Sequence, residues 1–289
     1  MTVLELIERS SARLDQAGVS FGQGTTNAFD EAAWLVLWRL GLPLDDLAGV
    51  AERPVPAADR LSVEALIGER ITTRKPAAYL TGEAWLQGVP FQVDERTIVP
   101  RSLIAEVLAN GVLDAWLPRE PRRVLDLCTG NGSLAVLAAM AWPRCRVDAA
   151  DVSTDALAVA QRNVNRHRLA ERITLVSSDG FAALDDGYDL ILCNPPYVNA
   201  RSMAALPAEF RAEPALALAG GADGMDFVRR LLADAPTRLA ADGLLVLEIG
   251  HERTHFDAAF SGLEVIGLPT SAGDDAVLLV TRAGLEAAR

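Results

Sequence analysis

The first 75 residues repeat apolar positions with the period of amphipathic helices. Leu4, Ile7 and Leu14 would lie on one face of a first helix. A second helix is expected over residues 31–40, which are rich in Ala, Leu and Trp. No titratable cluster stands out among these positions. We therefore expect residues 1–75 to form a helical module that serves in packing or in docking a substrate.

A third helix of this module is expected over residues 61–71. Its predicted buried face consists of the apolar residues in helical register, namely Leu61, Ala65, Leu66 and Ile71. Residues 76–100 then mix aromatic and β-branched residues with Gly and Pro, which is typical of a β-hairpin. We expect this stretch to link the helical module to the rest of the chain.

Residues 101–289 begin with a predicted helix over 102–116 and then alternate apolar runs of strand length with helical segments. The predicted strands cover residues 124–128, 147–150, 173–178, 190–193 and 244–249, and the helices between them cover 133–142, 155–168 and 225–240. This alternation indicates a parallel sheet covered on both faces. The last two runs, 263–268 and 276–281, are too close for a crossover helix and should be antiparallel. The predicted fold is α/β and Rossmann-like, with seven strands, mostly parallel, and an antiparallel last strand.

Charge and cysteine content narrow the possible partners. The 289 residues include 39 acidic and 27 basic side chains, so the formal net charge is −12. Such a surface repels a nucleic acid backbone and favours a basic protein as partner. The three cysteines, Cys128, Cys145 and Cys193, form no CxxC pair, which indicates reduced thiols and a cytoplasmic protein. No apolar run approaches the ~20 residues of a membrane span, and no signal sequence is apparent at the N-terminus.

A glycine loop follows the first predicted strand of this sheet, in the stretch VLDLCTGNGSLAV. Gly130 and Gly132 would let the backbone approach a ligand, and the next helix offers unpaired N–H groups. Asp151 ends the second strand, where a carboxylate can accept hydrogen bonds from both ribose hydroxyls of a nucleoside. The alternative is a tight turn followed by an Asp that only caps a helix.

Two further acids distinguish between nucleosides. Gly130-x-Gly132-x-x-Ala135 also fits the loose dinucleotide pattern. Asp126, four residues before Gly130, has no clear role beside a pyrophosphate, but it can meet the charged amino acid end of S-adenosylmethionine. Asp179, at the end of the third strand, can accept a hydrogen bond from the adenine amine, and the alternative is a simple helix cap. Together these positions favour S-adenosylmethionine as the cofactor.

The stretch ILCNPPYV ends the fourth strand in Asn194, Pro195, Pro196 and Tyr197. Two prolines fix two φ angles and donate no hydrogen bonds. The Asn194 side-chain oxygen and the Pro195 carbonyl would then form a rigid pair of acceptors for a planar –NH2 group, on which Tyr197 can stack. The alternative is a turn that stops the strand and packs a tyrosine.

These motifs resemble those of class I S-adenosylmethionine-dependent methyltransferases that alkylate planar amino nitrogens. With IVPRS ahead of the first strand and EFRAEPALALAGGADGMD after NPPY, the chain is similar to the protein-(glutamine-N5) methyltransferases. The resemblance implies transfer of a methyl group to a glutamine side chain, with Asn194, Pro195, Pro196 and Tyr197 as the catalytic residues. It implies a cofactor site made of Asp126, Cys128, Thr129, Gly130, Asn131, Gly132, Asp151, Val152, Asp179, Gly180 and Asn194. It also implies a pocket rim at Pro100 and Arg101, although Arg101 could equally be a surface ion-pair partner.

Two types of glutamine methyltransferase compete for this resemblance. The release factor type usually carries Pro-Arg-Pro and Leu-Gly-Thr-Gly, whereas this chain has PRSL at residues 100–103 and LCTG at residues 127–130. Both features resemble the ribosomal protein L-three type, so the expected substrate is a free, basic large-subunit ribosomal protein. Asn131 and Ser133 depart from the family pattern and should alter only the packing of the loop. A DNA adenine methyltransferase would need a basic groove, and a noncatalytic nucleoside-binding module would not need NPPY.

The stretch HERTH matches the zinc protease signature H-E-x-x-H. His251 follows a predicted strand and Gly250, so it would stand at the very start of a helix rather than within one. His167 is the only other histidine that could complete a ligand set. We expect no metal site here.

Overall fold

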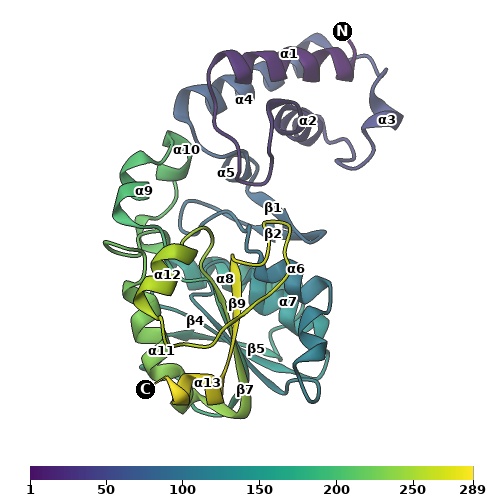
Figure 1. The fold of residues 1–289 in the computed structure, drawn as a ribbon. Coiled ribbons are helices and arrows are strands. Elements are labelled where there is room, and N and C mark those ends of the chain that lie inside the picture. Colours follow the sequence, from purple (N-terminus) through teal and green to yellow (C-terminus); the bar gives the residue numbers. More distant parts are fainter. Residues whose placement is uncertain (289) are drawn as a thin grey trace.

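A computed structural model of the protein describes residues 1–288 and contains a helical part and a sheet part (Figure 1). The helical part consists of α1 (Val3–Gln16), α2 (Ala28–Arg39), α3 (Leu47–Val50), α4 (Ala57–Thr73) and α5 (Ala77–Thr81). A β-hairpin of β1 (Glu83–Leu86) and β2 (Val89–Gln92) follows it. No helix among the described residues is both long and apolar enough to cross a membrane.

Side-chain caps mark the beginnings of α1 and α2. At α1, Thr2 Oγ1 accepts a hydrogen bond from the backbone N–H of Glu5, whose carboxylate accepts one from the Thr2 N–H. The second helix begins at Ala28 because the Asn27 side chain caps it, three residues before the predicted start at residue 31. Such a cap contributes about 1 kcal/mol.

The predicted buried face of the third helix was right at Leu66 and wrong at Leu61 and Ala65. Leu61 is 66% exposed on α4, and Ala65 is exposed as well. The buried residues of α4 are Val63, Leu66, Ile67 and Arg70. Arg70, in the turn after Ile67, is fully buried. The buried face of α4 therefore includes a charged residue, which a search for apolar positions does not find. On α1, likewise, Leu6 rather than Leu4 is fully buried beside Ile7.

The sheet of seven strands confirms the predicted fold. Its strands are β3 (Arg123–Leu127), β4 (Arg146–Asp151), β5 (Ile173–Ser177), β6 (Tyr188–Cys193), β7 (Leu239–Glu248), β8 (Ile266–Gly267) and β9 (Val277–Thr281). They lie in the order β5-β4-β3-β6-β7-β9-β8. The first five are parallel, whereas β9 is antiparallel to both β7 and β8.

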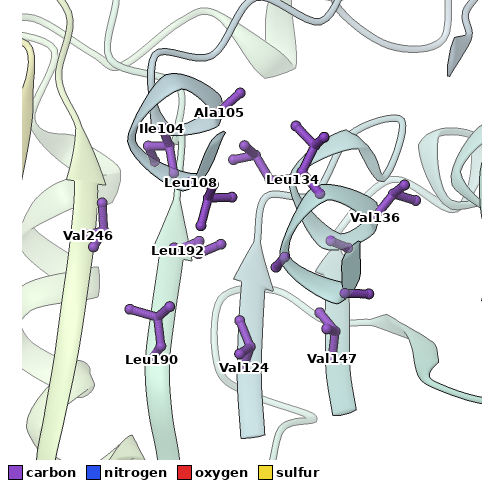
Figure 2. Packing of buried hydrophobic residues seen from close by; sticks show 14 of the residues in the cluster. Ile104, Ala105, Leu108, Val124, Leu134, Val136, Val147, Leu190, Leu192 and Val246 are labelled. Atoms are coloured by element: carbon purple, nitrogen blue, oxygen red, sulfur yellow. The ribbon is translucent and has the colours of Figure 1, made fainter. Parts of the chain in front are cut away.

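Helices cover both faces of this sheet. They are α6 (Ile104–Ala109), α7 (Ser133–Ala141), α8 (Thr154–Arg166), α11 (Asp226–Arg238), α12 (Arg253–Ala259) and α13 (Arg282–Ala287). Two short helices, α9 (Ala200–Ala205) and α10 (Ala208–Arg211), lie instead toward the helical part (Figure 1). Figure 2 shows Ile104 and Leu108 of α6 and Leu134 of α7 packed over the strands. The helix predicted over residues 102–116 is interrupted, because Gly111 has φ +64° and a 3-10 turn, Val112–Ala115, follows it.

The strand order places the two main motifs together. From β3 the chain extends the sheet to one side through β4 and β5, and then to the other side through β6 and β7. Ligands bind beyond the carboxyl ends of parallel strands at such a switch point. The glycine loop follows β3 and the NPPY stretch follows its neighbour β6, so both reach this edge of the sheet.

Candidate active site

The loop after β3 has an unusual backbone. Cys128, Gly130 and Gly132 have φ values of +62°, +56° and +80°. At a non-glycine residue such as Cys128 this conformation costs about 1–2 kcal/mol. A β-carbon at Gly132 would lie 3.1 Å from Cβ of Ala160, so this glycine permits close packing of α8. A β-carbon at Gly130 would meet no atom within 4 Å, which leaves the backbone there open to a ligand.

Asp126 supports this loop from beneath. Its side chain is fully buried, and Oδ2 accepts hydrogen bonds from Thr129 Oγ1 (2.5 Å) and from the Ala135 N–H (2.9 Å). Its Oδ1 has no hydrogen-bond partner within residues 1–288. Burial raises the pKa of Asp126 to about 7, against the lowering effect of the two hydrogen bonds. The sequence suggested direct contact with a cofactor, but Asp126 does not line the cavity above the loop.

Asp151, at the end of β4, joins the second strand to the loop. Its Oδ2 accepts a hydrogen bond from the Gly130 N–H and its Oδ1 accepts one from the Ser153 N–H, both at 2.9 Å. Burial raises the pKa of Asp151, while these backbone hydrogen bonds act to lower it. The carboxylate lines the cavity and is held in a fixed orientation.

A cavity of about 340 Å³ lies above the glycine loop. The predicted cofactor residues that line it are Cys128, Gly130, Asp151, Val152, Asp179, Gly180 and Asn194. Thr129, Asn131 and Gly132 lie in the loop but, like Asp126, outside the lining. Asp179 forms an ion pair with Arg230 (2.7 Å), in which both side chains are more than half exposed. Its position at the rim leaves it accessible to a ligand.

A second cavity, of about 200 Å³, adjoins the first. Pro195 and Tyr197 line it, and Asn194 lines both cavities. No group within residues 1–288 forms a hydrogen bond with the Asn194 side chain or with the Pro195 carbonyl. Two acceptors therefore stand unused at the junction of the cavities. A group that entered from the second cavity would meet a ligand of the first at Asn194.

Tyr197 is fixed by residues that the sequence analysis missed. Its hydroxyl donates to Glu248 Oε1 at 3.4 Å, and Glu248 Oε2 accepts from Ser102 Oγ (2.5 Å) and from the Leu103 N–H (2.9 Å). Burial raises the pKa of both Glu248 and Tyr197. A β-carbon at Gly250 would lie 2.7 Å from the tyrosine ring, so only glycine fits there. An acid inside the apolar run LLVLEIG was the available signal.

Arg101 belongs to the wall of the second cavity. It donates two hydrogen bonds to Glu213, from Nη1 to Oε1 (2.6 Å) and from Nη2 to Oε2 (2.8 Å). The Glu213 side chain is fully buried and also accepts from the Val99 N–H. The Arg101 guanidinium lies 5.5 Å from the centre of the Phe210 ring. Arg101 is thus in an ion pair, but one that shapes a cavity rather than one on the open surface, and Pro100 lies buried behind it.

Known proteins match both parts of the chain. Residues 5–82 match the family model of the PrmC N-terminal domain, and residues 106–221 match that of the methyltransferase small domain. The chain is 56% identical to a ribosomal protein uL3 glutamine methyltransferase of Bordetella pertussis, over 97% of this chain and 95% of that protein. It is 51% identical to the one of Burkholderia pseudomallei, over 99% and 96%. The chain belongs to the ribosomal protein uL3 glutamine methyltransferase family.

The family assignment confirms the resemblance inferred from the motifs and makes the protein a methyltransferase. A crystal structure of a methyltransferase from Pyrococcus furiosus shares the fold of this uL3 glutamine methyltransferase family member. Its TM-score is 0.50 at 19% identity, covering 68% of this chain and 90% of that chain. The sheet and its helices are thus those of a methyltransferase.

The H-E-x-x-H stretch of this uL3 glutamine methyltransferase family member has a different geometry from a zinc site. His251 precedes α12, which begins at Arg253, and its side chain is 71% exposed. The buried Glu252 accepts hydrogen bonds from Asn199 Nδ2 (2.7 Å) and shares one with His255 Nδ1 (2.5 Å). Within the described chain, no group of three or more candidate ligands could hold a metal ion. Glu252 instead fixes the chain that follows NPPY.

Proposed function

We propose that this protein transfers a methyl group from S-adenosylmethionine to the side-chain amide nitrogen of a glutamine in ribosomal protein uL3. The observation that carries the proposal is the position of Asn194, whose unpartnered side chain lies at the junction of the two cavities. The first cavity would hold the cofactor, and the second would hold the glutamine.

The residues around the first cavity fit this cofactor. Gly130 leaves its side of the loop open, and Asp151 presents a fixed carboxylate where ribose hydroxyls can donate to it. Asp126 Oδ1 and Asn131 Nδ2 are buried beneath the loop and have no hydrogen-bond partner among residues 1–288, which suits a charged amino acid group bound nearby. When bound, S-adenosylmethionine supplies a methyl group that its sulfonium already activates.

The residues after β6 would prepare the amide nitrogen. An amide lone pair is normally delocalised into the carbonyl group, so the nitrogen is a poor nucleophile. Asn194 Oδ1 and the Pro195 carbonyl would each accept one of its hydrogens, fix its orientation and stabilise the positive charge that grows on it. Pro195 and Pro196 hold these acceptors rigidly, because the ring of each proline restricts φ.

No side chain of the second cavity needs to act as a general base. Hydrogen bonds from Ser102, Leu103 and Tyr197 occupy the Glu248 carboxylate, and burial raises the pKa of Tyr197. The amide nitrogen becomes acidic once it is alkylated, so its proton can leave after the transfer. The role of the chain is therefore to orient the amide and exclude water.

The names of the relatives and the net charge of the chain both favour uL3 as the substrate. Curated relatives that cover nearly the whole chain are named for uL3. Ribosomal proteins are generally basic because they bind RNA, and the charge of −12 would attract a free one electrostatically. We place this reaction in the cytoplasm, before uL3 joins the subunit, without direct nucleic acid contact or a metal. The helical module over residues 1–75 would dock part of the substrate.

A labelling experiment tests the proposal. The protein is incubated with S-adenosylmethionine carrying a labelled methyl group, together with free uL3 or with a purified peptide chain release factor. Mass spectrometry then locates the label. We expect it on one glutamine of uL3, whereas labelling of the release factor alone would assign the protein to the other substrate. Unlabelled proteins in both reactions would overturn the proposed function.

A further inference from the structure

A buried cluster of charges connects the helical part to the sheet part. Arg70 of α4 is 1% exposed, and its Nε donates to Glu31 Oε1 of α2 at 2.8 Å. Its Nη1 lies 3.5 Å from Glu209 Oε1 of α10, and Glu209 is 2% exposed. Arg74 Nη1 donates to the same Glu209 oxygen at 3.2 Å. Two guanidinium groups thus face two carboxylates, one of which comes from the sheet part.

One backbone group and one side chain of the helical part complete the contact with Glu209. The Ser20 N–H donates to Glu209 Oε1 at 3.2 Å, and Gln23 Nε2 donates to the Glu209 carbonyl at 3.4 Å. Although burial acts to raise it, hydrogen bonds such as those from Ser20 and Arg74 hold the pKa of Glu209 below its ordinary value. The residue is therefore a charged anchor set into the helical part.

The residue after this anchor forms part of the proposed glutamine pocket. Phe210 lines the second cavity and packs under the Arg101 guanidinium. A β-carbon at Gly22 would lie 3.3 Å from Phe210 Cζ, so the helical part also touches the outer edge of the ring. Figure 1 shows α10 next to this part of the helical module. Any movement of Glu209 would move the pocket wall.

We propose that Glu209 is a positioning residue for methyl transfer, through which Arg70 and Arg74 of the helical part hold Phe210 and the Arg101 wall in place around the substrate glutamine. This inference rests on the proposed function. It gives the helical part a second task besides docking, because it completes the shape of a pocket that its own side chains do not line.

The test compares Glu209→Gln with the wild type, using free uL3 as the substrate. A loosened pocket wall should raise KM for uL3 by about tenfold, with kcat changed by less than about threefold and cofactor affinity unchanged. A merely structural role would lower the amount of folded enzyme, which reduces apparent kcat at constant KM. Glu95→Gln is the matched control, because Glu95 forms an exposed ion pair with Lys75 and lines neither cavity.

Arg74→Gln is the second variant if Glu209→Gln does not fold. Arg74 is 30% exposed and is one of two arginines that contact Glu209, so its loss should disturb the fold less. This variant should raise KM for uL3 in the same direction by a smaller factor. The double variant should exceed Glu209→Gln by less than the effect of Arg74→Gln alone, since the two changes share one interaction, while Arg74 also donates to the Gly18 and Ala17 carbonyls. An unchanged KM in these variants, or an equal rise in Glu95→Gln, would overturn the positioning role.

Hydrogen exchange separates this inference from the proposed function. Amides of residues 206–218 should exchange faster in Glu209→Gln than in the wild type, while those of β3 and β6 should not change. This measurement needs no substrate. Unchanged exchange in residues 206–218 would overturn the coupling even if uL3 is methylated, whereas a wild type that fails to methylate uL3 would overturn only the function.

Discussion

Two sets of buried carboxylates, one in the interior of the sheet part and one where it meets the helical part, are satisfied by different partners. In the sheet part, Asp126 and Glu248 accept hydrogen bonds only from hydroxyl and backbone N–H groups, and burial raises the pKa of both. At the boundary of the helical part, Glu209 meets two guanidinium groups, and its pKa is lowered. Asp126 organises a loop and Glu248 links β7 to Ser102 through neutral donors, whereas Glu209 links the sheet part to the helical part through charged ones.

This difference separates the tasks of the two parts. A buried acid whose hydrogen bonds come from neutral donors can hold the backbone of a binding loop. It needs no cationic partner, which would otherwise lie close to the cationic cofactor. An acid paired with arginines costs less to bury as a charge than an acid without a cationic partner. We therefore expect changes in the sheet part to affect the cofactor or the chemistry, and changes around Glu209 to affect the protein substrate.

The largest effect is expected in the pH dependence of stability. Asp126 has a folded-state pKa of about 7, above its ordinary value of 3.8, so its protonated form favours the fold. Its contribution is complete below about pH 4 and is lost as the pH rises through 7, by about 4 kcal/mol in the free energy of unfolding. Chemical denaturation across this pH range should show the free energy of unfolding of the wild type falling by this amount relative to that of Asp126→Asn.

Glu209→Gln is the contrasting variant for this measurement. Because the pKa of Glu209 is lowered, its contribution is present above the ordinary value of 4.5 and is lost as the pH falls through the folded-state pKa. Stability differences of the two variants from the wild type should therefore change with pH in opposite directions. If both stability differences change with pH in the same direction, the distinction between the two kinds of buried acid is wrong.

Asn194→Ala should separate the chemistry from cofactor binding. Loss of the acceptor at the junction of the cavities should reduce kcat by about 100-fold or more, as for the loss of an oxyanion-hole donor. Calorimetry should find nearly unchanged affinity for S-adenosylmethionine. Asn165→Ala, at an exposed position on α8, is the matched control. A variant of Asn194 with wild-type turnover would remove the acceptor pair from the mechanism.

Asp151→Ala should show the reverse order of effects. The carboxylate would accept charge-assisted hydrogen bonds from ribose, so its loss should weaken cofactor binding by roughly 1.5–3 kcal/mol. Titration calorimetry with S-adenosylmethionine measures the change directly. Asp155→Ala, in the first turn of α8, tests whether removing any nearby negative charge has the same effect. Unaltered affinity in Asp151→Ala would show that another residue holds the ribose.

The smallest effect is expected from salt on the encounter with uL3. The rate at low uL3 concentration should fall as the ionic strength rises from about 20 to 300 mM, where the Debye length shrinks from roughly 20 Å to under 8 Å. Opposite net charges would steer this encounter, and screening weakens the attraction. A short uncharged peptide with the target glutamine should show no such fall. A release factor methylated as fast as uL3, with no salt dependence for either, contradicts this prediction.

The local features of this protein were predictable from its sequence. The alternation of apolar runs predicted the order of strands and helices and the antiparallel β9, because each period is set by residues only a few positions apart. The open backbone expected at Gly130 is also found, with positive φ angles at Gly130 and Gly132 that glycine adopts without steric cost. The same holds for the stiff NPPY turn, since the prolines restrict their own backbone and that of Asn194.

The tertiary structure alone decided which charges are buried and what they contact. Arg101 and Glu213 are 112 residues apart, and Arg74 and Glu209 are 135 apart, so no local pattern pairs them. A charged residue in a sequence is expected on the surface, because burying it alone costs several kcal/mol. Arg70 can be buried only where the fold brings acids from α2 and α10 against α4. The sequence by itself therefore determined the elements and the chemical motifs, and long-range packing determined the charge pairs that shape the pocket around them.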